Sequence, residues 1–260
     1  MIEPVMIRVY DGAQRGATAF FRNRPLLDRL VAELRERAGP SPRVFVHACS
    51  IGAEPYSLAL RCRHLSGPPM TPTITATDLN PSFLEAARAG VYPEVVLEGM
   101  TAEERGWFEP AGAGEVRVPD ATRRQVEFLP PRSFLDPLDA RYDAVLLLNA
   151  LTYVSPAEQS LALQHAAAAS RHLLALTAFH PDTIRADLGS AGFEPVLEDQ
   201  RLIHEAWGER LAPHPVPEDR PEYSWRLPPF DTAVPDRAYR FCSLFARSHH
   251  VGSPGDTERR

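Results

Sequence analysis

The alternation of short apolar runs and helical patterns between residues 43 and 93 constrains the fold more than any other feature of the chain. Residues 44–48 are mostly β-branched or aromatic, and they predict a short buried strand. A turn that ends on Gly52 follows, where the missing side chain would let the backbone approach a ligand. Pro55 then stands in the first turn of a helical pattern, where its fixed φ is favourable. Strand, glycine turn and helix form the first half of a nucleotide-binding βαβ unit.

The second half of this unit is a strand that ends on a carboxylate. Residues 72–77 predict the strand, Asp78 follows it directly, and a helix is expected over residues 82–89. An acid at this place can accept hydrogen bonds from both hydroxyl groups of a ribose, each worth about 1.5–3 kcal/mol. Only one glycine is present where dinucleotide sites use three, and Asp78 could instead only complement the N-terminus of the next helix. On the pattern alone, both interpretations of Asp78 stay open.

Four stretches of the chain share a further pattern. Residues 18–22 read Thr-Ala-Phe-Phe-Arg, and residues 48–59 read Ala-Cys-Ser-Ile-Gly-Ala-Glu-Pro-Tyr-Ser-Leu-Ala. Residues 76–92 begin with Ala-Thr-Asp-Leu-Asn and end with Ala-Arg-Ala-Gly-Val-Tyr. Residues 142–153 begin with Tyr-Asp-Ala and end with Asn-Ala-Leu-Thr-Tyr. In this order the four stretches resemble the motifs of the chemotaxis-receptor glutamate methyltransferases of the CheR type.

The resemblance implies a fold and a co-substrate. The fold is that of a class I methyltransferase, a Rossmann-like α/β domain whose seven-stranded, mostly parallel sheet has helices on both faces and an antiparallel last strand. The co-substrate is S-adenosylmethionine (SAM), and no metal is implied. The cofactor-binding residues that the motifs imply are Thr18, Arg22, Ala48, Cys49, Ser50, Gly52, Glu54, Asp78, Leu79, Ser133, Phe134, Asn149 and Ala150.

Tyr153 and Arg22 are the residues to which the resemblance gives a catalytic role. Arg22, together with Thr18, would close the cofactor site over the methionine part of SAM, since a guanidinium can hold a carboxylate through two hydrogen bonds. Tyr153 matches the active-site tyrosine of the family, and its phenol would donate a hydrogen bond rather than act as a base. The alternatives are a surface arginine and a half-buried core tyrosine. Ser133 and Phe134 would flank the adenine or belong only to a proline-stiffened loop.

Two departures from the motifs bear on the acceptor. Ala53 replaces an acid of the family pattern and Leu148 replaces an arginine, and the printed sequence shows no counterpart of the family's helical N-terminal domain. Because of these differences, we expect the methyl acceptor to be a small-molecule or carrier- or peptide-bound biosynthetic intermediate and not a chemoreceptor. Methylation of a carboxylate oxygen is the expected reaction, because a carboxylate is nucleophilic at neutral pH without a base.

Two other functions remain open. One is an enzyme that consumes SAM without methylating, by an intramolecular displacement that releases methylthioadenosine. The other is a catalytically silent SAM-binding partner protein. The nucleoside product, S-adenosylhomocysteine or methylthioadenosine, separates the first from a methyltransferase, and the absence of turnover separates the second.

The size and charge of the chain limit its organisation and partners. We expect one domain over residues 1–247, with an N-terminal cap segment over 1–40, and a disordered tail over 248–260. Residues 203–237 are rich in proline and are expected to form a lid in place of the inserted subdomain that the family carries before its last strand, or only to cover the flank of the sheet. The net charge of −6 argues against nucleic acid as a partner, and the absence of a signal or spanning pattern indicates a cytoplasmic protein without a membrane partner. The sequence does not indicate an oligomeric state.

Overall fold

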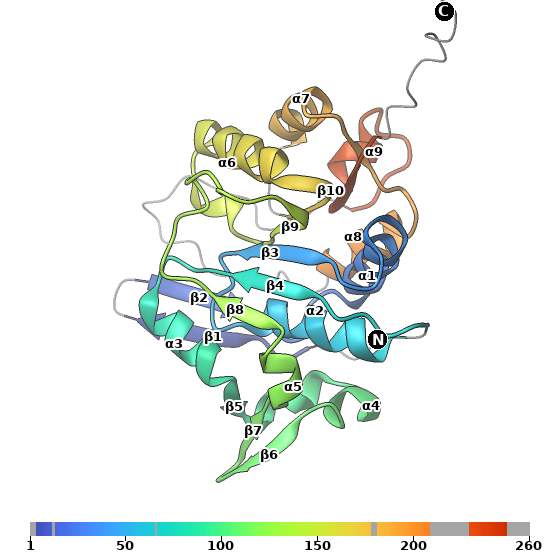
Figure 1. Cartoon of the computed structure of the whole chain (residues 1–260). Helices are drawn as coiled ribbons and strands as arrows, with labels where there is room; N and C mark the ends of the chain where they lie inside the picture. Colours follow the sequence, from blue (N-terminus) through green and yellow to red (C-terminus); the bar gives the residue numbers. More distant parts are fainter. Residues whose placement is uncertain (1–3, 12–13, 66, 178–180, 209–228, 249–260) are drawn as a thin grey trace, which may run out of the picture.

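The computed structural model describes residues 4–11, 14–65, 67–177, 181–208 and 229–248. Seven of its strands form one sheet in the order β11-β12-β10-β9-β3-β4-β8 (Figure 1). These strands are β3 (Arg43–His47), β4 (Thr73–Ala76), β8 (Val126–Phe128), β9 (Tyr142–Leu147), β10 (Ser170–Leu176), β11 (Phe193–Pro195) and β12 (Leu244–Arg247). β12 runs antiparallel to both of its neighbours, and the other paired strands of the sheet are parallel. The predicted class I methyltransferase fold is thus confirmed.

Helices cover both faces of this sheet and bury two separate cores. Successive residues of a strand point to opposite faces, so Val44 and Val46 join one core while Phe45 joins the other. The first core contains residues of α1 (Arg24–Ala38), α2 (Ala53–His64), α3 (Pro81–Ala89) and α8 (Gln200–Gly208). The second core contains residues of α6 (Pro156–Ala169) and α7 (Pro181–Ser190). In the described residues, no helix is both long and apolar enough to cross a membrane.

Side-chain caps set where several helices begin. The Asn80 side chain accepts a hydrogen bond from the backbone N–H of Ser82, at 2.8 Å, and so caps α3. Ser155 and Glu158 form the reciprocal capping box of α6, with proline at the first helical position. A second capping box starts at Thr101 and opens α4 (Ala102–Arg105). Both boxes follow the Ser/Thr-x-x-Glu pattern that marks a helix start in a sequence.

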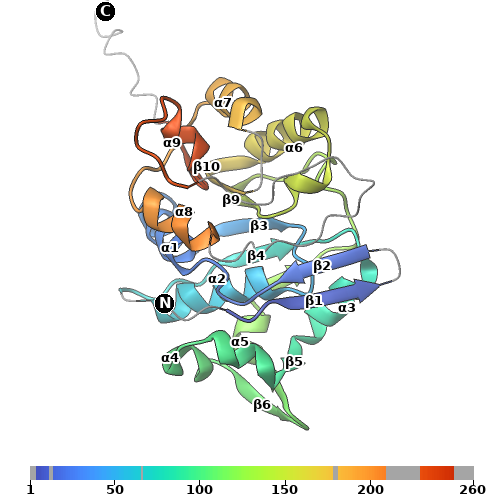
Figure 2. The ribbon, with the colours of Figure 1, turned by 180° about the vertical axis from the view of Figure 1, so that it is seen from behind.

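A hairpin of β1 (Ile7–Asp11) and β2 (Gln14–Thr18) forms part of the segment expected as an N-terminal cap. Figure 2 shows it beside α2 and α3. Gly16 allows the hairpin to come this close, because a Cβ atom there would lie 2.9 Å from Ser50 Oγ and 3.0 Å from Phe83 Cε2. The hairpin therefore covers the turn that follows β3.

A small three-stranded antiparallel sheet includes part of residues 111–124, whose glycine, proline and charged residues predict an irregular or hairpin-like connection. Its strands are β5 (Val91–Pro93), β6 (Glu109–Gly112) and β7 (Glu115–Arg117), in the order β5-β7-β6. It projects from one end of the molecule (Figure 1) and comes before β8 in the chain. Short helical turns complete this region: η1 (Glu94–Gly99), α4 and α5 (Asp120–Arg123).

The last part of the chain differs from expectation in one respect. The apolar and aromatic residues between 239 and 246 predict a last strand over that range, but α9 (Arg237–Arg240) occupies its start, and β12 begins only at Leu244. Within the expected lid, residues 203–208 belong to α8, while 209–228 lie outside the described residues, as does the tail from 249 onward.

Candidate functional site

The loops after β3 and β9 hold backbone conformations that are rare for residues other than glycine. Ala48 and Ser50 have φ values of 50°, and Asn149 has a φ of 56°. A left-handed conformation costs a residue with a side chain roughly 1–2 kcal/mol. β3 and β9 are adjacent parallel strands, so these residues meet at the carboxyl edge of the sheet, where ligands bind in open α/β folds. Strain concentrated at this edge marks a candidate site.

Asp78, at the end of β4, connects two loops of this edge. Its Oδ2 accepts a hydrogen bond from the backbone N–H of Ser50 at 2.8 Å, and its Oδ1 accepts one from the N–H of Asn80 at 3.0 Å. The side-chain cap of α3 is Asn80, and Asp78 lies two residues before it, where its carboxylate binds the N–H of that cap residue. Asp78 is half-buried, and each oxygen keeps a lone pair that can accept a further donor.

Gly52 lies close to two neighbouring elements. Its φ of 88° favours glycine, and a Cβ atom there would lie 3.1 Å from Ala87 Cβ and 3.2 Å from Phe128 Cζ. The missing side chain thus lets the turn pack against α3 and β8.

A polar cluster joins the segment before α1 to the start of α2. The Thr18 hydroxyl donates a hydrogen bond to the Glu54 carboxylate. Burial raises the pKa of Glu54, while the Thr18 hydroxyl and the charge of Arg22 oppose that rise. Burial also lowers the pKa of Arg22, against the charge of Glu54, but an arginine remains a cation at any physiological pH. The cluster therefore holds the cation of Arg22 beside Glu54 in a poorly hydrated place.

Arg22 faces a small cavity of about 20 Å³, enough for one water molecule. The Arg22 Cζ lies 5.6 Å from the centroid of the Trp207 ring, within the range of a cation–π interaction. The cavity is lined by Ala19, Arg22, Asn23, Leu26, Leu27, Glu54, Ser57, Leu148 and Trp207. Sequence reasoning missed Trp207, because it lies on α8, outside the four motifs, and only the fold brings it to Arg22. Leu148 gives the cavity an apolar side where the family pattern has an arginine.

The residues after β9 divide between the site and the core. Asn149 donates its backbone N–H to Thr177 Oγ1 at 2.7 Å, and its side-chain Nδ2 is buried without a partner among the described residues. Ala150 is buried in the second core. Tyr153, in the helical turn η2 (Leu151–Tyr153), is 60% exposed, and its electrostatic effect on the pKa of Arg22 places it near that guanidinium.

Two residues of the first motif point their side chains into the protein. Cys49 is fully buried, burial raises the pKa of its thiol well above the usual value, and its backbone N–H donates to the Thr77 carbonyl at 3.0 Å. Ala48 packs against the second core. With their side chains turned inward, Ala48 and Cys49 could contact a ligand only through backbone groups.

The loop after β8 reaches the site through its backbone. The Arg132 N–H donates to the Asp78 carbonyl at 3.1 Å. Ser133 Oγ accepts a hydrogen bond from the Leu135 N–H at 3.1 Å, and Phe134 packs against the second core. The backbone of this loop thus reaches Asp78, while the side chains of Ser133 and Phe134 contact other residues of the protein.

Several buried polar atoms at this edge have no hydrogen-bond partner among the described residues. They are Arg22 Nε, Ser50 Oγ, Asn149 Nδ2 and Thr152 Oγ1. An unpaired buried polar group costs about 1–3 kcal/mol, so unpaired groups in the loops that follow β3 and β9 fit a polar ligand. Leu79, next to Asp78, is 59% exposed and offers an apolar contact. This donor and acceptor set suits the ribose, the flat base and the charged amino-acid end of SAM.

Comparison with known proteins finds relatives in sequence and in fold. The family model described as CheR methyltransferase, SAM binding domain, matches residues 16–175. The chemotaxis protein methyltransferase of Vibrio parahaemolyticus is 34% identical over 173 residues, 62% of this chain and 62% of that protein. Chemotaxis protein methyltransferase 1 of Vibrio cholerae is 32% identical over 174 residues, again 62% of each. The chain thus spans less than two thirds of the length of these curated relatives.

Among solved structures, magnesium protoporphyrin IX methyltransferase (ChlM) from Synechocystis PCC 6803 with bound SAM aligns with 67% of this chain and 71% of that chain, at 18% identity and a TM-score of 0.42.

Proposed function

The chain belongs to the family of CheR methyltransferase SAM-binding domains, and from this premise we propose that it is a SAM-dependent methyltransferase that methylates a carboxylate. The observation on which the proposal rests is the convergence of Asp78, Asn149 and Arg22, with their unused hydrogen-bonding capacity, around the carboxyl edge of β3, β4 and β9.

Each part of SAM has a partner in this arrangement. The free lone pairs of Asp78 would accept the two ribose hydroxyls, and the exposed Leu79 would cover a face of the adenine. Arg22 would bind the amino-acid carboxylate through its unused donors, which the low hydration of the site makes stronger. Ser50 and Asn149 are further hydrogen-bonding groups within the same edge.

SAM, when bound, supplies a methyl group on a positively charged sulfur. The chain's own residues then have to position the acceptor and exclude water, and orientation alone can contribute about 7–11 kcal/mol in favourable cases. The β1–β2 hairpin covers the turn at Ser50, and Trp207 covers Arg22. Tyr153, exposed at the mouth of the site, would donate its phenolic hydrogen to a substrate oxygen. A carboxylate acceptor requires no base from the protein.

The acceptor that we propose is a carboxylate on a protein. The sequence favours a small-molecule or carrier- or peptide-bound acceptor, but the two relatives described above are named as chemotaxis protein methyltransferases, which supports a protein acceptor. The apolar contribution of Leu148 to the cavity beside Arg22 suits the exclusion of water in either case.

Incubation with SAM that carries a labelled methyl group tests the proposal. The purified protein is mixed with SAM and a bacterial extract, the protein fraction is separated from the small molecules, and both are treated with mild base. A methyl ester releases its label as methanol under these conditions, so base-labile label in the protein fraction is expected.

Two outcomes would contradict parts of the proposal. Base-labile label found only among the small molecules would reject the protein acceptor and restore the small-molecule one. Mass spectrometry that finds methylthioadenosine as the sole nucleoside product, without S-adenosylhomocysteine, would reject methyl transfer altogether.

A further inference from the structure

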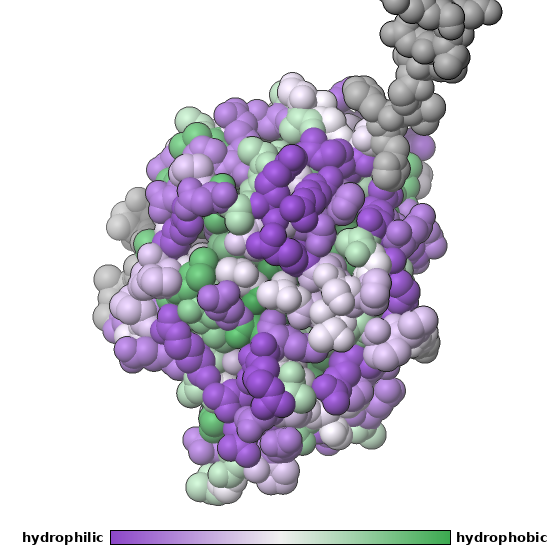
Figure 3. Space-filling view, in the orientation of Figure 1, coloured by the Kyte–Doolittle hydropathy of each residue, from purple (hydrophilic) through white to green (hydrophobic). Residues whose placement is uncertain are grey.

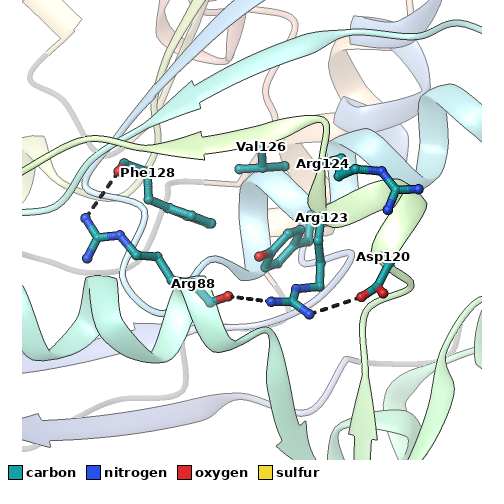
Figure 4. Close-up of a pocket in the computed structure, with 7 residues that line it drawn as sticks. Arg88, Asp120, Arg123, Arg124, Val126 and Phe128 are labelled. Atoms are coloured by element: carbon teal, nitrogen blue, oxygen red, sulfur yellow. Dashed lines mark hydrogen bonds and ion pairs between the residues drawn. The ribbon is translucent and has the colours of Figure 1, made fainter.

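An open pocket of about 350 Å³ lies beside β8, the edge strand of the main sheet, outside the candidate SAM site. It is lined by Tyr56, Arg88, Asp120, Arg123, Arg124, Val126 and Phe128 (Figure 4). In the space-filling view, hydrophobic surface gathers near the centre of the face where β8 lies, and hydrophilic side chains border it (Figure 3). The volume lies within the range of small-molecule pockets, which is about 300–1,000 Å³.

The floor of this pocket is apolar and aromatic. Val126 and Phe128 are two residues apart in β8, so their side chains lie on the same face of the strand. The Tyr56 ring lies 5.6 Å from the Phe128 ring at an angle of 69°. Its hydroxyl donates to the Ala87 carbonyl at 2.8 Å, and burial raises the pKa of Tyr56 to about 12, so the phenol stays neutral. A planar or aliphatic group can pack against this floor.

Two arginines at the rim are held in place by neighbouring groups. Arg123 donates from Nη1 to Asp120 Oδ1 and from Nη2 to the Arg88 carbonyl, both at 3.1 Å (Figure 4). Arg88 donates from Nη2 to the Phe128 and Leu129 carbonyls, at 3.2 and 3.1 Å. Carbonyl oxygens are neutral, so these bonds orient the guanidinium of Arg88 without cancelling its charge.

The third arginine is open to a ligand. Arg124 is exposed, and its guanidinium has no hydrogen-bond or ion-pair partner among the described residues. The lining thus has three arginines and one aspartate, a charge of +2, in a chain whose net charge is −6. A positive pocket on an acidic protein attracts anions.

We propose that this pocket is a second binding site, which takes a small organic anion: its phosphate or carboxylate meets Arg123 and Arg124, and its ring or aliphatic body covers Phe128. Guanidinium groups form paired, charge-assisted hydrogen bonds with both kinds of anion. The site does not depend on the proposed methyl transfer.

Phenyl phosphate and phenylacetate are suitable probes, because each joins an anion to a ring. Titration into the full chain, followed by amide chemical shifts in NMR spectra, is expected to move the signals of residues 120–128. The stronger of the two probes identifies the anion that the site prefers, and inorganic phosphate is expected to bind at least tenfold more weakly because it leaves the floor uncovered.

Arg124→Gln is expected to reduce the affinity for the better probe about tenfold, since it removes a charged donor. Arg63→Gln, at an exposed arginine of α2, is the matched control and is expected to bind as the wild type does. Failure of both probes to bind, or equal affinity of wild type and Arg124→Gln, would overturn the proposal.

Discussion

The candidate SAM site and the arginine pocket beside β8 differ in how far the protein alone satisfies their polar groups. Around Asp78 the backbone is strained, and buried donors such as Asn149 Nδ2 lack partners among the described residues. In the pocket, Arg88 and Arg123 are already hydrogen-bonded to carbonyls, and Arg124 is in solvent. A ligand would supply hydrogen-bond partners that the polar groups of the first region lack. In the second region it would add contacts to groups that the protein and solvent already satisfy. Substitutions in the first should therefore change both stability and binding, and those in the second binding alone.

Asp78→Ala should have the largest effect. It removes the acceptor for two ribose hydroxyls and for the N–H groups of Ser50 and Asn80, and each charge-assisted bond is worth about 1.5–3 kcal/mol. We expect the affinity for SAM, measured by calorimetry, to fall at least a hundredfold and the melting temperature to decrease. Glu85→Ala, at an exposed acid of α3, is the control. Unchanged affinity for SAM in Asp78→Ala would remove Asp78 from the ribose site.

Tyr153→Phe should reduce turnover about tenfold or more, while SAM binding changes little, because the hydroxyl is assigned to a substrate oxygen. The side chain is 60% exposed, so the free energy of unfolding should stay within about 0.5 kcal/mol of the wild type. Separate measurement of kcat and of the Kd for SAM checks this. Equal losses in both would reject the active-site role of Tyr153.

Glu54→Gln should change how stability depends on pH. Burial raises the pKa of Glu54 in the folded protein, so the folded state holds the proton more tightly than the unfolded chain does. The resulting stabilisation is present below the unfolded pKa of about 4.3 and is lost as the pH rises through the folded pKa. Glutamine cannot ionise, so at neutral pH the variant should melt at a higher temperature than the wild type. Thermal unfolding between about pH 4 and 8 tests this, and a difference that grows toward low pH would contradict it.

Arg124→Gln should have the smallest effect on SAM binding and on stability. The affinity for SAM should stay within about twofold and the melting temperature within the equivalent of about 0.5 kcal/mol, as is usual for exposed positions. A loss of stability like that of Asp78→Ala would mean that the two regions do not differ in the way described here.

The sequence predicts the β3–α2–β4–α3 unit well, because apolar runs, Pro55 and the residues before Pro81 give local signals for strands, turn and caps. It does not predict the small sheet β5-β7-β6 fully. Its strands are three or four residues long, and all four residues of β6 are exposed, so no alternation of apolar and polar residues marks them.

The side-chain contacts of the two sites were harder to predict than the strands that hold them. The motifs identified Asp78 and Arg22, but Trp207 reaches Arg22 only through the packing of α8, which no local pattern specifies. The arginines of the pocket likewise resemble ordinary surface residues in the sequence. Pairing of β8 with β4 and the position of α5 bring them together, and both are consequences of the complete fold.

The close approach of the hairpin at Gly16 has a consequence for the speed of ligand exchange. What covers Ser50 there is backbone, because Gly16 has no side chain to rotate aside. Access to the Ser50 hydroxyl by this route therefore requires β1 and β2 to lift together. Loop motions of this kind take on the order of nanoseconds to microseconds, against picoseconds to nanoseconds for a rotamer change. The rates at which a ligand enters and leaves past Ser50 would then be limited by this backbone motion and not by a side-chain rotation.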